Sequence, residues 1–189
     1  VSVADDAISS LADQFPFPDK LLVHTSGTTG LEVLQAASVQ TGVFYPLQTF
    51  SKLRPVDFSK VPVAIEGNTT QVEEILLELA GSLTQKTVVF DSERRKSLHV
   101  AAVFACNFSN HLYTIASEIL KESGLDFDLI RPLIAETSDK VQYFFPQEVQ
   151  TGPAVRKDQN VINKHLTFLD SKPELKELYK ALSQNIINF

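Results

Sequence analysis

Residues 62–91 read PVAIEGNTTQVEEILLELAGSLTQKTVVFD, and this stretch indicates the class of fold to expect. Pro62–Ile65 and Thr87–Phe90 are short apolar runs, as strands buried on both faces usually are. Between them, apolar residues recur at the spacing of a helix with one apolar face: Val72, Ile75, Leu76 and Leu79. A helix between two buried strands predicts a mostly parallel α/β sheet that is covered on both faces.

The same alternation of strands and helices extends back to the first residues. It predicts a strand end at Val1–Ala4, a helix from Asp5 and Asp6 to about Asp13, a break at Phe15–Pro18, a strand at Leu21–His24, a helix from about Thr29 to Ala37 and a strand at Gly42–Tyr45. Because the chain opens within this pattern and contains no methionine, we expect further strands of the sheet to lie upstream of it.

From Ser92 onward the sequence carries only helical signals. It predicts a helix from Ser92, as cap, to about Ser123 with Gly124 as its stop, a second helix from Phe127 to about Phe144 with an interruption near Pro132, a loop over Pro146–Pro153, and two more helices at Asp158 to about Leu169 and Pro173 to about Ile187. We therefore expect an α/β domain over residues 1–91 and an all-α domain over residues 92–189.

Composition and charge exclude several classes of function. The 189 residues are 43% hydrophobic and 21% charged, which is globular composition, and the net charge of −6 without a basic cluster argues against binding to nucleic acid. The four histidines have no ligand pair at metal spacing, so we expect no metal site. Cys106 is the single cysteine and the N-terminus is acidic, so we expect a cytoplasmic protein.

The predicted helix that starts at Ser92 is unusual in its middle, because Ser97–Ser117 contains no Asp, Glu, Lys or Arg. The stretch is about as long as a membrane span, but polar side chains interrupt it, which favours a helix buried in a soluble protein or dimer. At about 100° per residue, four of these side chains form one stripe, whereas His111 lies further round. The stripe consists of His99, Asn107, Asn110 and Thr114. Its partner is either another helix or a substrate.

Two turns carry residues that suit a ligand. Thr25-Ser26-Gly27-Thr28-Thr29-Gly30 follows a predicted strand, where hydroxyls and amides face a ligand or simply cap a helix. A Gly152-Pro153 turn places Arg156 just before a predicted helix, where its guanidinium binds an anionic group or pairs with a structural carboxylate.

Five strings together make the chain resemble a family of Rossmann-like NADP-dependent oxidoreductases with a helical C-terminal domain of unknown function. They are Val3–Ile8, His24–Gly27, Pro46–Phe50, Leu98–Phe108 and Thr151–Arg156. The family is similar to pyrroline-5-carboxylate reductase and the β-hydroxyacid dehydrogenases, in which a dinucleotide-binding domain precedes a helical domain that dimerises. No G-x-G-x-x-G turn occurs in the chain, so the resemblance implies one within about 100 residues upstream, given βαβ units of roughly 30 residues.

The resemblance implies the C-terminal part of a Rossmann-like parallel sheet followed by an all-α dimerisation domain. It implies an NAD(P)-dependent oxidoreductase that acts on a small polar metabolite and assembles as a homodimer. The cofactor, NADP or NAD, would pass Ala4, Asp5, Thr25 and Ser26 at the carboxyl ends of the strands.

The same resemblance implies roles for residues of the long helix and its surroundings. Asn107 would orient the substrate. The β-hydroxyacid dehydrogenases use a Lys and an Asn on their long helix, but here Lys96 lies three turns before Asn107. A histidine, His99, His111 or His24, would therefore have to be the proton donor. Gln48, Asn110, His111 and Arg156 would bind the substrate. The alternative function is a non-catalytic sensor or scaffold that binds a nucleotide or metabolite and dimerises.

Overall fold

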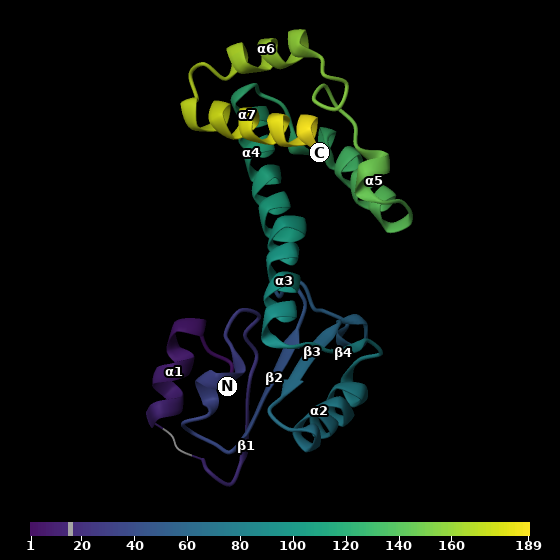
Figure 1. Ribbon diagram of the computed structural model, residues 1–189. Coiled ribbons are helices and arrows are strands. Elements are labelled where there is room, and N and C mark those ends of the chain that lie inside the picture. Colours follow the sequence, from purple (N-terminus) through teal and green to yellow (C-terminus); the bar gives the residue numbers. More distant parts are fainter. Residues whose placement is uncertain (15–16) are drawn as a thin grey trace. The chain divides into compact units, whose positions relative to one another are not determined.

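A four-stranded sheet forms the centre of the N-terminal half of the structure, a computed structural model that describes residues 1–14 and 17–189 (Figure 1). The strands are β1 (Leu21–His24), β2 (Gln40–Pro46), β3 (Val63–Gly67) and β4 (Thr87–Val89), and they lie in the order β1-β2-β3-β4. Two of the three neighbouring pairs are parallel, whereas β2 and β3 are antiparallel. The predicted mostly parallel sheet is thus confirmed.

The antiparallel pair follows from the way the chain returns after β2. Between β2 and β3 the described residues hold a short 3₁₀ helix, η2 (Phe58–Lys60), and no crossover helix that would bring β3 back in the parallel sense. The amide of Leu47 donates to the carbonyl of Pro62 at 2.8 Å, which continues the ladder beyond the strands.

Helices cover both faces of the sheet, as expected (Figure 1). On one face, α2 (Thr70–Leu83) packs its buried side chains on Val63 and Ile65, and Thr69 caps this helix by accepting a hydrogen bond from the amide of Val72. On the other face lies α1 (Asp5–Gln14), which begins and ends close to where the sequence predicts. Its apolar cluster is Ile8, Ala12, Leu34 and Ala37, with Leu22 packed against it.

Two predicted elements of this half are wrong, and a third lies partly outside the description. Residues 1–4 form no strand, and the Val1 amine donates to the carbonyl of Val23 instead. The helix predicted from Thr29 to Ala37 is reduced to the 3₁₀ helix η1 (Leu31–Leu34), because the amides of Gln35 and Ala37 bond three residues back. The predicted break at Phe15–Pro18 includes residues 15 and 16, which lie outside the described residues.

A long helix follows the sheet. It consists of α3 (Ser92–Ala102), a π-helical segment η3 (Val103–Phe108) and α4 (Ser109–Glu122). Its cap is Asp91, which accepts from the amide of Arg94 at 2.8 Å, and not Ser92 as predicted, because Ser92 is bonded to Glu66. Gly124 ends the helix as predicted, with a φ of +68° that glycine adopts at low cost.

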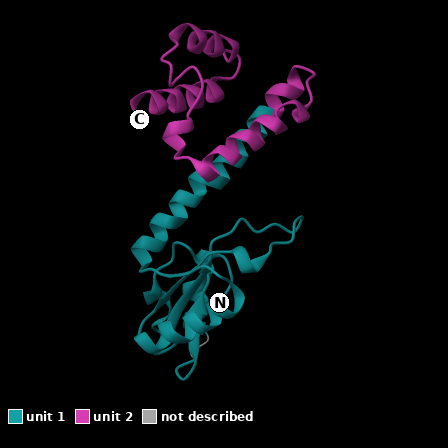
Figure 2. Ribbon diagram, turned by 90° about the vertical axis from the view of Figure 1, so that its right-hand side faces the viewer, with its two compact units in different colours: residues 1–116 teal, residues 117–189 magenta. Residues whose placement is uncertain are grey.

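The helices of the C-terminal part follow the predicted pattern, except that the predicted loop over Pro146–Pro153 begins with a short 3₁₀ helix. They are η4 (Phe127–Leu129), α5 (Arg131–Tyr143), η5 (Pro146–Val149), α6 (Gln159–Phe168) and α7 (Pro173–Asn188). The chain packs as two compact units, residues 1–116 and 117–189 (Figure 2). The domain boundary at residues 91–92 stays a prediction. Among the helices of residues 1–14 and 17–189, none is both long and apolar enough to cross a membrane.

Candidate functional site

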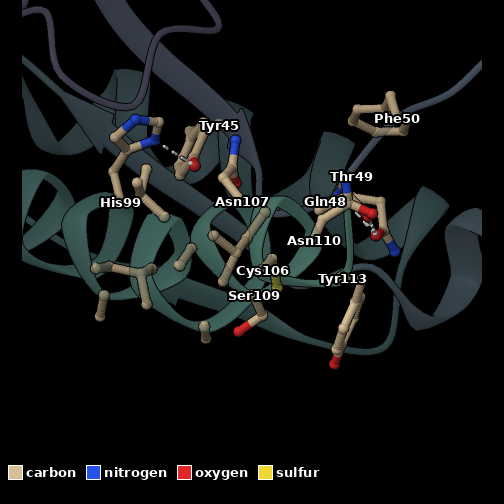
Figure 3. A pocket seen from close by; sticks show the side chains of 16 residues that line it. Tyr45, Gln48, Thr49, Phe50, His99, Cys106, Asn107, Ser109, Asn110 and Tyr113 are labelled. Carbon is tan, nitrogen blue, oxygen red and sulfur yellow. Dashed lines mark hydrogen bonds between the residues drawn. The ribbon is translucent and has the colours of Figure 1, made fainter. Parts of the chain in front are cut away.

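A cleft of about 950 Å³ lies in the first unit, between the end of β2 and one side of the long helix (Figure 3). Residues 45–50 contribute Tyr45, Gln48, Thr49 and Phe50, and the helix contributes side chains from Leu98 to Tyr113. Three residues of the predicted polar stripe, His99, Asn107 and Asn110, line this cleft together with the predicted Gln48. The structure thus brings four predicted site residues to one cleft, and their roles stay predictions.

Tyr45 and His99 form a hydrogen-bonded pair at one end of the cleft. The Tyr45 hydroxyl and His99 Nδ1 are 3.0 Å apart, and the dashed line in Figure 3 marks this bond. Burial raises the pKa of Tyr45, and the nearby Asp5 carboxylate raises it further, against the opposing effect of the Arg95 cation. Tyr45 is therefore a neutral hydroxyl at physiological pH, able both to donate and to accept.

Gly27 packs directly against this pair. A Cβ atom at residue 27 would lie 2.6 Å from His99 Nδ1 and 2.9 Å from Tyr45 Cζ, closer than side chains approach one another. The absence of a side chain there lets the turn after β1 support both rings. Three segments distant in sequence, the turn, β2 and α3, thus meet at the Tyr45–His99 pair.

The π-helical segment carries the central residues of the cleft wall. Val103, Ala105, Cys106 and Asn107 all lie in it and line the cleft. A π-helical turn places more residues in each turn than an α-helix does and is often found at functional sites. Asn107 and Cys106 are exposed in this chain, so the amide of Asn107 is accessible to a ligand.

His24, predicted as a second proton donor, lies outside this cleft. Its side chain is fully buried, Nδ1 accepts from the amide of Ser26 at 3.1 Å, and Nε2 lies 3.3 Å from the carbonyl of Gly30. Both ring nitrogens therefore hold the turn together. Burial, and then the Arg95 cation, lower the pKa of His24, so the ring is neutral.

The predicted cofactor residues meet at the start of α1 and in the turn after β1. Asp5 Oδ2 accepts from the hydroxyls of Ser26 and Thr28, both at 2.7 Å, and the hydroxyl of Thr25 lies 3.4 Å from that of Ser2. Burial alone would raise the pKa of Asp5, but the two hydroxyl bonds outweigh it and the net direction is downward. Asp5 is thus an ionised acceptor, and the exposed Ala4 precedes it.

A buried ion pair between Arg95 and Glu66 lies next to the site and was not predicted from the sequence. Arg95 is fully buried, one turn before His99, and its guanidinium donates to Glu66, to the carbonyl of Thr29 and to the hydroxyl of Ser92. Glu66 also accepts from the amide and the hydroxyl of Ser92. The network ties β3, α3 and the turn after β1 to one another.

Two other predicted residues of the long helix do not line the cleft: His111, predicted to bind the substrate, and Thr114 of the polar stripe. The hydroxyl of Thr114 donates to the carbonyl of Asn110. Arg156 is exposed and belongs to the second unit, where the neighbouring Lys157 has a φ of +54°. The role of Arg156 stays a prediction.

Sequence reasoning also missed Tyr45, which completes the pair with His99. A usable signal existed, because Tyr45 stands at the carboxyl end of a strand parallel to β1, the edge at which α/β proteins bind ligands. The one-turn spacing of Arg95 and His99 was a second signal, since residues four apart share a helix face.

Comparison with known proteins places the chain among oxidoreductase-like structures. Residues 61–186 match the family described as Domain of unknown function (DUF2520). The crystal structure of a "putative NADP oxidoreductase" from Bacteroides fragilis is 44% identical, with a TM-score of 0.94, over 100% of this chain and 74% of that one. A protein from Thermotoga maritima is 25% identical, with a TM-score of 0.77, over 98% of this chain and 75% of its own.

A more distant structure shares the fold alone. It is an imine reductase from Myxococcus stipitatus in complex with NADP+, 12% identical with a TM-score of 0.55, over 100% of this chain and 71% of that one. No curated protein matches the chain. The predicted resemblance to Rossmann-like oxidoreductases with a helical C-terminal domain is thereby confirmed.

Proposed function

The chain belongs to the DUF2520 family, and from that premise we propose that it is an NADP-dependent oxidoreductase that reduces or oxidises a small polar metabolite in the Tyr45–Asn110 cleft. The name of the Bacteroides fragilis relative, 44% identical over the whole chain, supports the cofactor and the reaction class. NAD remains the alternative cofactor.

The observation that carries this proposal is the pairing of a proton-bearing group with amides in one cleft. Asn107, Asn110 and Gln48 offer amide groups that orient a carbonyl, imine, hydroxyl or amine, and the Tyr45–His99 pair holds an exchangeable proton beside them. Interconversion of C=O and CH–OH, or of C=N and CH–NH, needs a hydride and a proton. NADP would supply or accept the hydride.

The residues after β1 and at the start of α1 fit part of this cofactor. Asp5 is an ionised acceptor that already binds two hydroxyl groups, so it suits a ribose hydroxyl rather than a phosphate. Ala4, Thr25 and Ser26 surround it with backbone and hydroxyl groups. These residues would hold the sugar near the Tyr45–His99 pair, which Gly27 joins to the same turn.

A homodimer belongs to the same proposal. Apolar side chains follow the long helix at four-residue spacing and are exposed: Val100 by 47%, Phe104 by 65%, Phe108 by 49% and Leu112 by 39%. Such a continuous apolar stripe is unfavourable in water, and a second copy of the chain would cover it by two-fold packing. Light scattering should give twice the chain mass of 21.0 kDa, and a monomer mass for a folded sample would contradict the dimer.

The function is tested with the full-length protein, NADPH, and two probes, pyrroline as the imine and cyclohexanone as the ketone. Nicotinamide fluorescence reports binding and loss of NADPH absorbance reports reduction. We expect binding of NADPH and its oxidation with at least one probe class. Binding without oxidation across both classes supports the sensor or scaffold instead, and absence of binding contradicts the proposal.

A further inference from the structure

We propose that the Tyr45 hydroxyl, positioned by His99, donates the proton to the substrate during reduction. This inference rests on the proposed oxidoreductase function and assigns the proton step within it. Of the two members of the pair, Tyr45 carries the proton that is transferred. His99 positions the Tyr45 hydroxyl and returns a proton to it afterwards.

The direction of the hydrogen bond decides the roles. When His99 Nδ1–H donates to the Tyr45 oxygen across their 3.0 Å separation, the hydroxyl hydrogen of Tyr45 is left free to point into the cleft. In the opposite tautomer the hydroxyl hydrogen is spent on His99 and no proton faces a ligand. His99 Nε2 has no hydrogen-bond partner among the described residues, and the His99 side chain is half-buried and lines the cleft.

The proton step balances with the hydride that NADPH would supply and one proton taken from solvent. The substrate carbon gains a hydride, the electron pair of its C=O or C=N bond moves to the oxygen or nitrogen, and that atom takes the proton from Tyr45 Oη. The Tyr45 oxygen then takes the Nδ1 proton of His99 as Nε2 takes one from water. His99 is left as the other neutral tautomer and returns by exchange with water.

Two features of the surroundings keep the pair in this arrangement. Both rings lie where a side chain at residue 27 would stand, so the pair in this arrangement requires the glycine. The buried Arg95, one helical turn before His99, anchors α3 to β3 and the turn. The pair is therefore fixed before any substrate arrives, which is the condition for efficient proton transfer.

The decisive variant is Tyr45→Phe, which keeps the ring and removes only the hydroxyl. We expect its kcat for whichever probe the wild type reduces to fall about 100-fold, as loss of a general acid does, with NADPH binding unchanged. The wild-type rate should slow in D₂O, and this solvent effect should be lost in Tyr45→Phe. A kcat within threefold of wild type, on the order of 0.7 kcal/mol, would overturn the proposal.

The chain offers a matched control and a readout that needs no activity. His165 and Tyr179 form a second such pair, 2.8 Å apart, in the second unit. Neither residue lines the cleft, so Tyr179→Phe removes a similar bond and should leave kcat unchanged. Nitrogen NMR should find hydrogen on Nδ1 of His99 in the wild type. Hydrogen on Nε2 alone would overturn the assignment even if no probe is reduced, whereas loss of NADPH binding would contradict only the function.

A second observation, the charge of the cleft, leads to a proposal about the substrate. Of the described residues that line the cleft, none is Asp, Glu, Lys or Arg. A carboxylate or phosphate bound there would lose water without gaining a cation, which is costly. We infer that the part of the substrate that enters this cleft is uncharged. It would be a ketone, aldehyde or imine whose neighbouring substituents are apolar.

Benzamide and benzoate test this inference, because they share shape and differ in charge. Each is titrated into the protein while the side-chain amide signals of Asn107 and Asn110 are followed by NMR. Benzamide should bind at least about tenfold more tightly, which corresponds to roughly 1.4 kcal/mol. Equal or tighter binding of benzoate would overturn the inference, and so would the failure of both probes to shift these signals.

Discussion

Replacing Arg95 by methionine should destabilise the first unit strongly. The guanidinium is fully buried and donates to Glu66, to the carbonyl of Thr29 and to the hydroxyl of Ser92. Methionine keeps an apolar stem of similar length and removes every one of these bonds. The Glu66 carboxylate, whose side chain is 15% exposed, then loses its counter-charge.

The expected cost follows from what remains around Glu66. Breaking a buried ion pair by removing one partner costs about 3–5 kcal/mol. Because the amide and the hydroxyl of Ser92 still donate to Glu66, at 3.1 and 2.9 Å, we expect the lower end of that range, about 3 kcal/mol. Glu66→Gln should cost a comparable amount, since it leaves the guanidinium charge buried and uncompensated.

Hydrogen exchange at the amides of β2 and β3 measures the loss, because Val43 and Ile65 are fully buried and report on the first unit. The matched control is Lys60→Met in the same unit, which removes an exposed i, i+3 pair with Asp57 at 3.3 Å and should change the stability little. If Arg95→Met is no more destabilising than Lys60→Met, the reasoning about this network is wrong.

Three further predictions concern pH, substrate orientation and helix ends. Burial lowers the pKa of His24 below its ordinary 6.5, so in acid the unfolded state binds more protons than the folded state. The stability of the first unit should therefore fall as the pH drops below 6.5. His24→Gln should flatten this pH dependence in hydrogen-exchange measurements. Asn107→Ala should lower kcat about tenfold, roughly 1.4 kcal/mol, with NADPH binding intact; an equal loss of stability and activity would indicate a packing role. Gly124→Ala should destabilise the protein by about 1 kcal/mol, because φ at this residue is +68°. Gly81 lies inside α2 with open space around it, so Gly81→Ala should stabilise the protein by about the same amount. Thermal unfolding measures both changes.

Much of the fold followed from local patterns in the sequence. The apolar runs at Leu21–His24 and Thr87–Phe90 became strands, and the caps at Asp158 and Gly124 set helix ends, because these effects act over a few residues. The antiparallel pairing of β2 and β3 did not follow, since it depends on the path of the chain between them. The π-helical turn at 103–108 likewise has no simple sequence signature.

Some residues of the candidate site could likewise be predicted from the sequence, and others could not. Helical spacing brought His99, Asn107 and Asn110 to one wall, which periodicity can predict. His24 instead turned inward, because strand alternation places it on the same face of β1 as Leu22, which packs against the buried cluster under α1. Tyr45 and Gly27 meet His99 only through the tertiary fold, so contact between them could not be read from spacing.

Transfer of deuterium tests the central claim most directly. NADPH labelled at the nicotinamide carbon that carries the hydride is incubated with the full-length protein and the probes pyrroline and cyclohexanone, and the products are analysed by mass spectrometry. The account predicts deuterium on the reduced carbon of a product, formed about 100-fold more slowly by Tyr45→Phe. Bound NADPH with no deuterium in either product, or transfer that is as fast in Tyr45→Phe as in wild type, would contradict it.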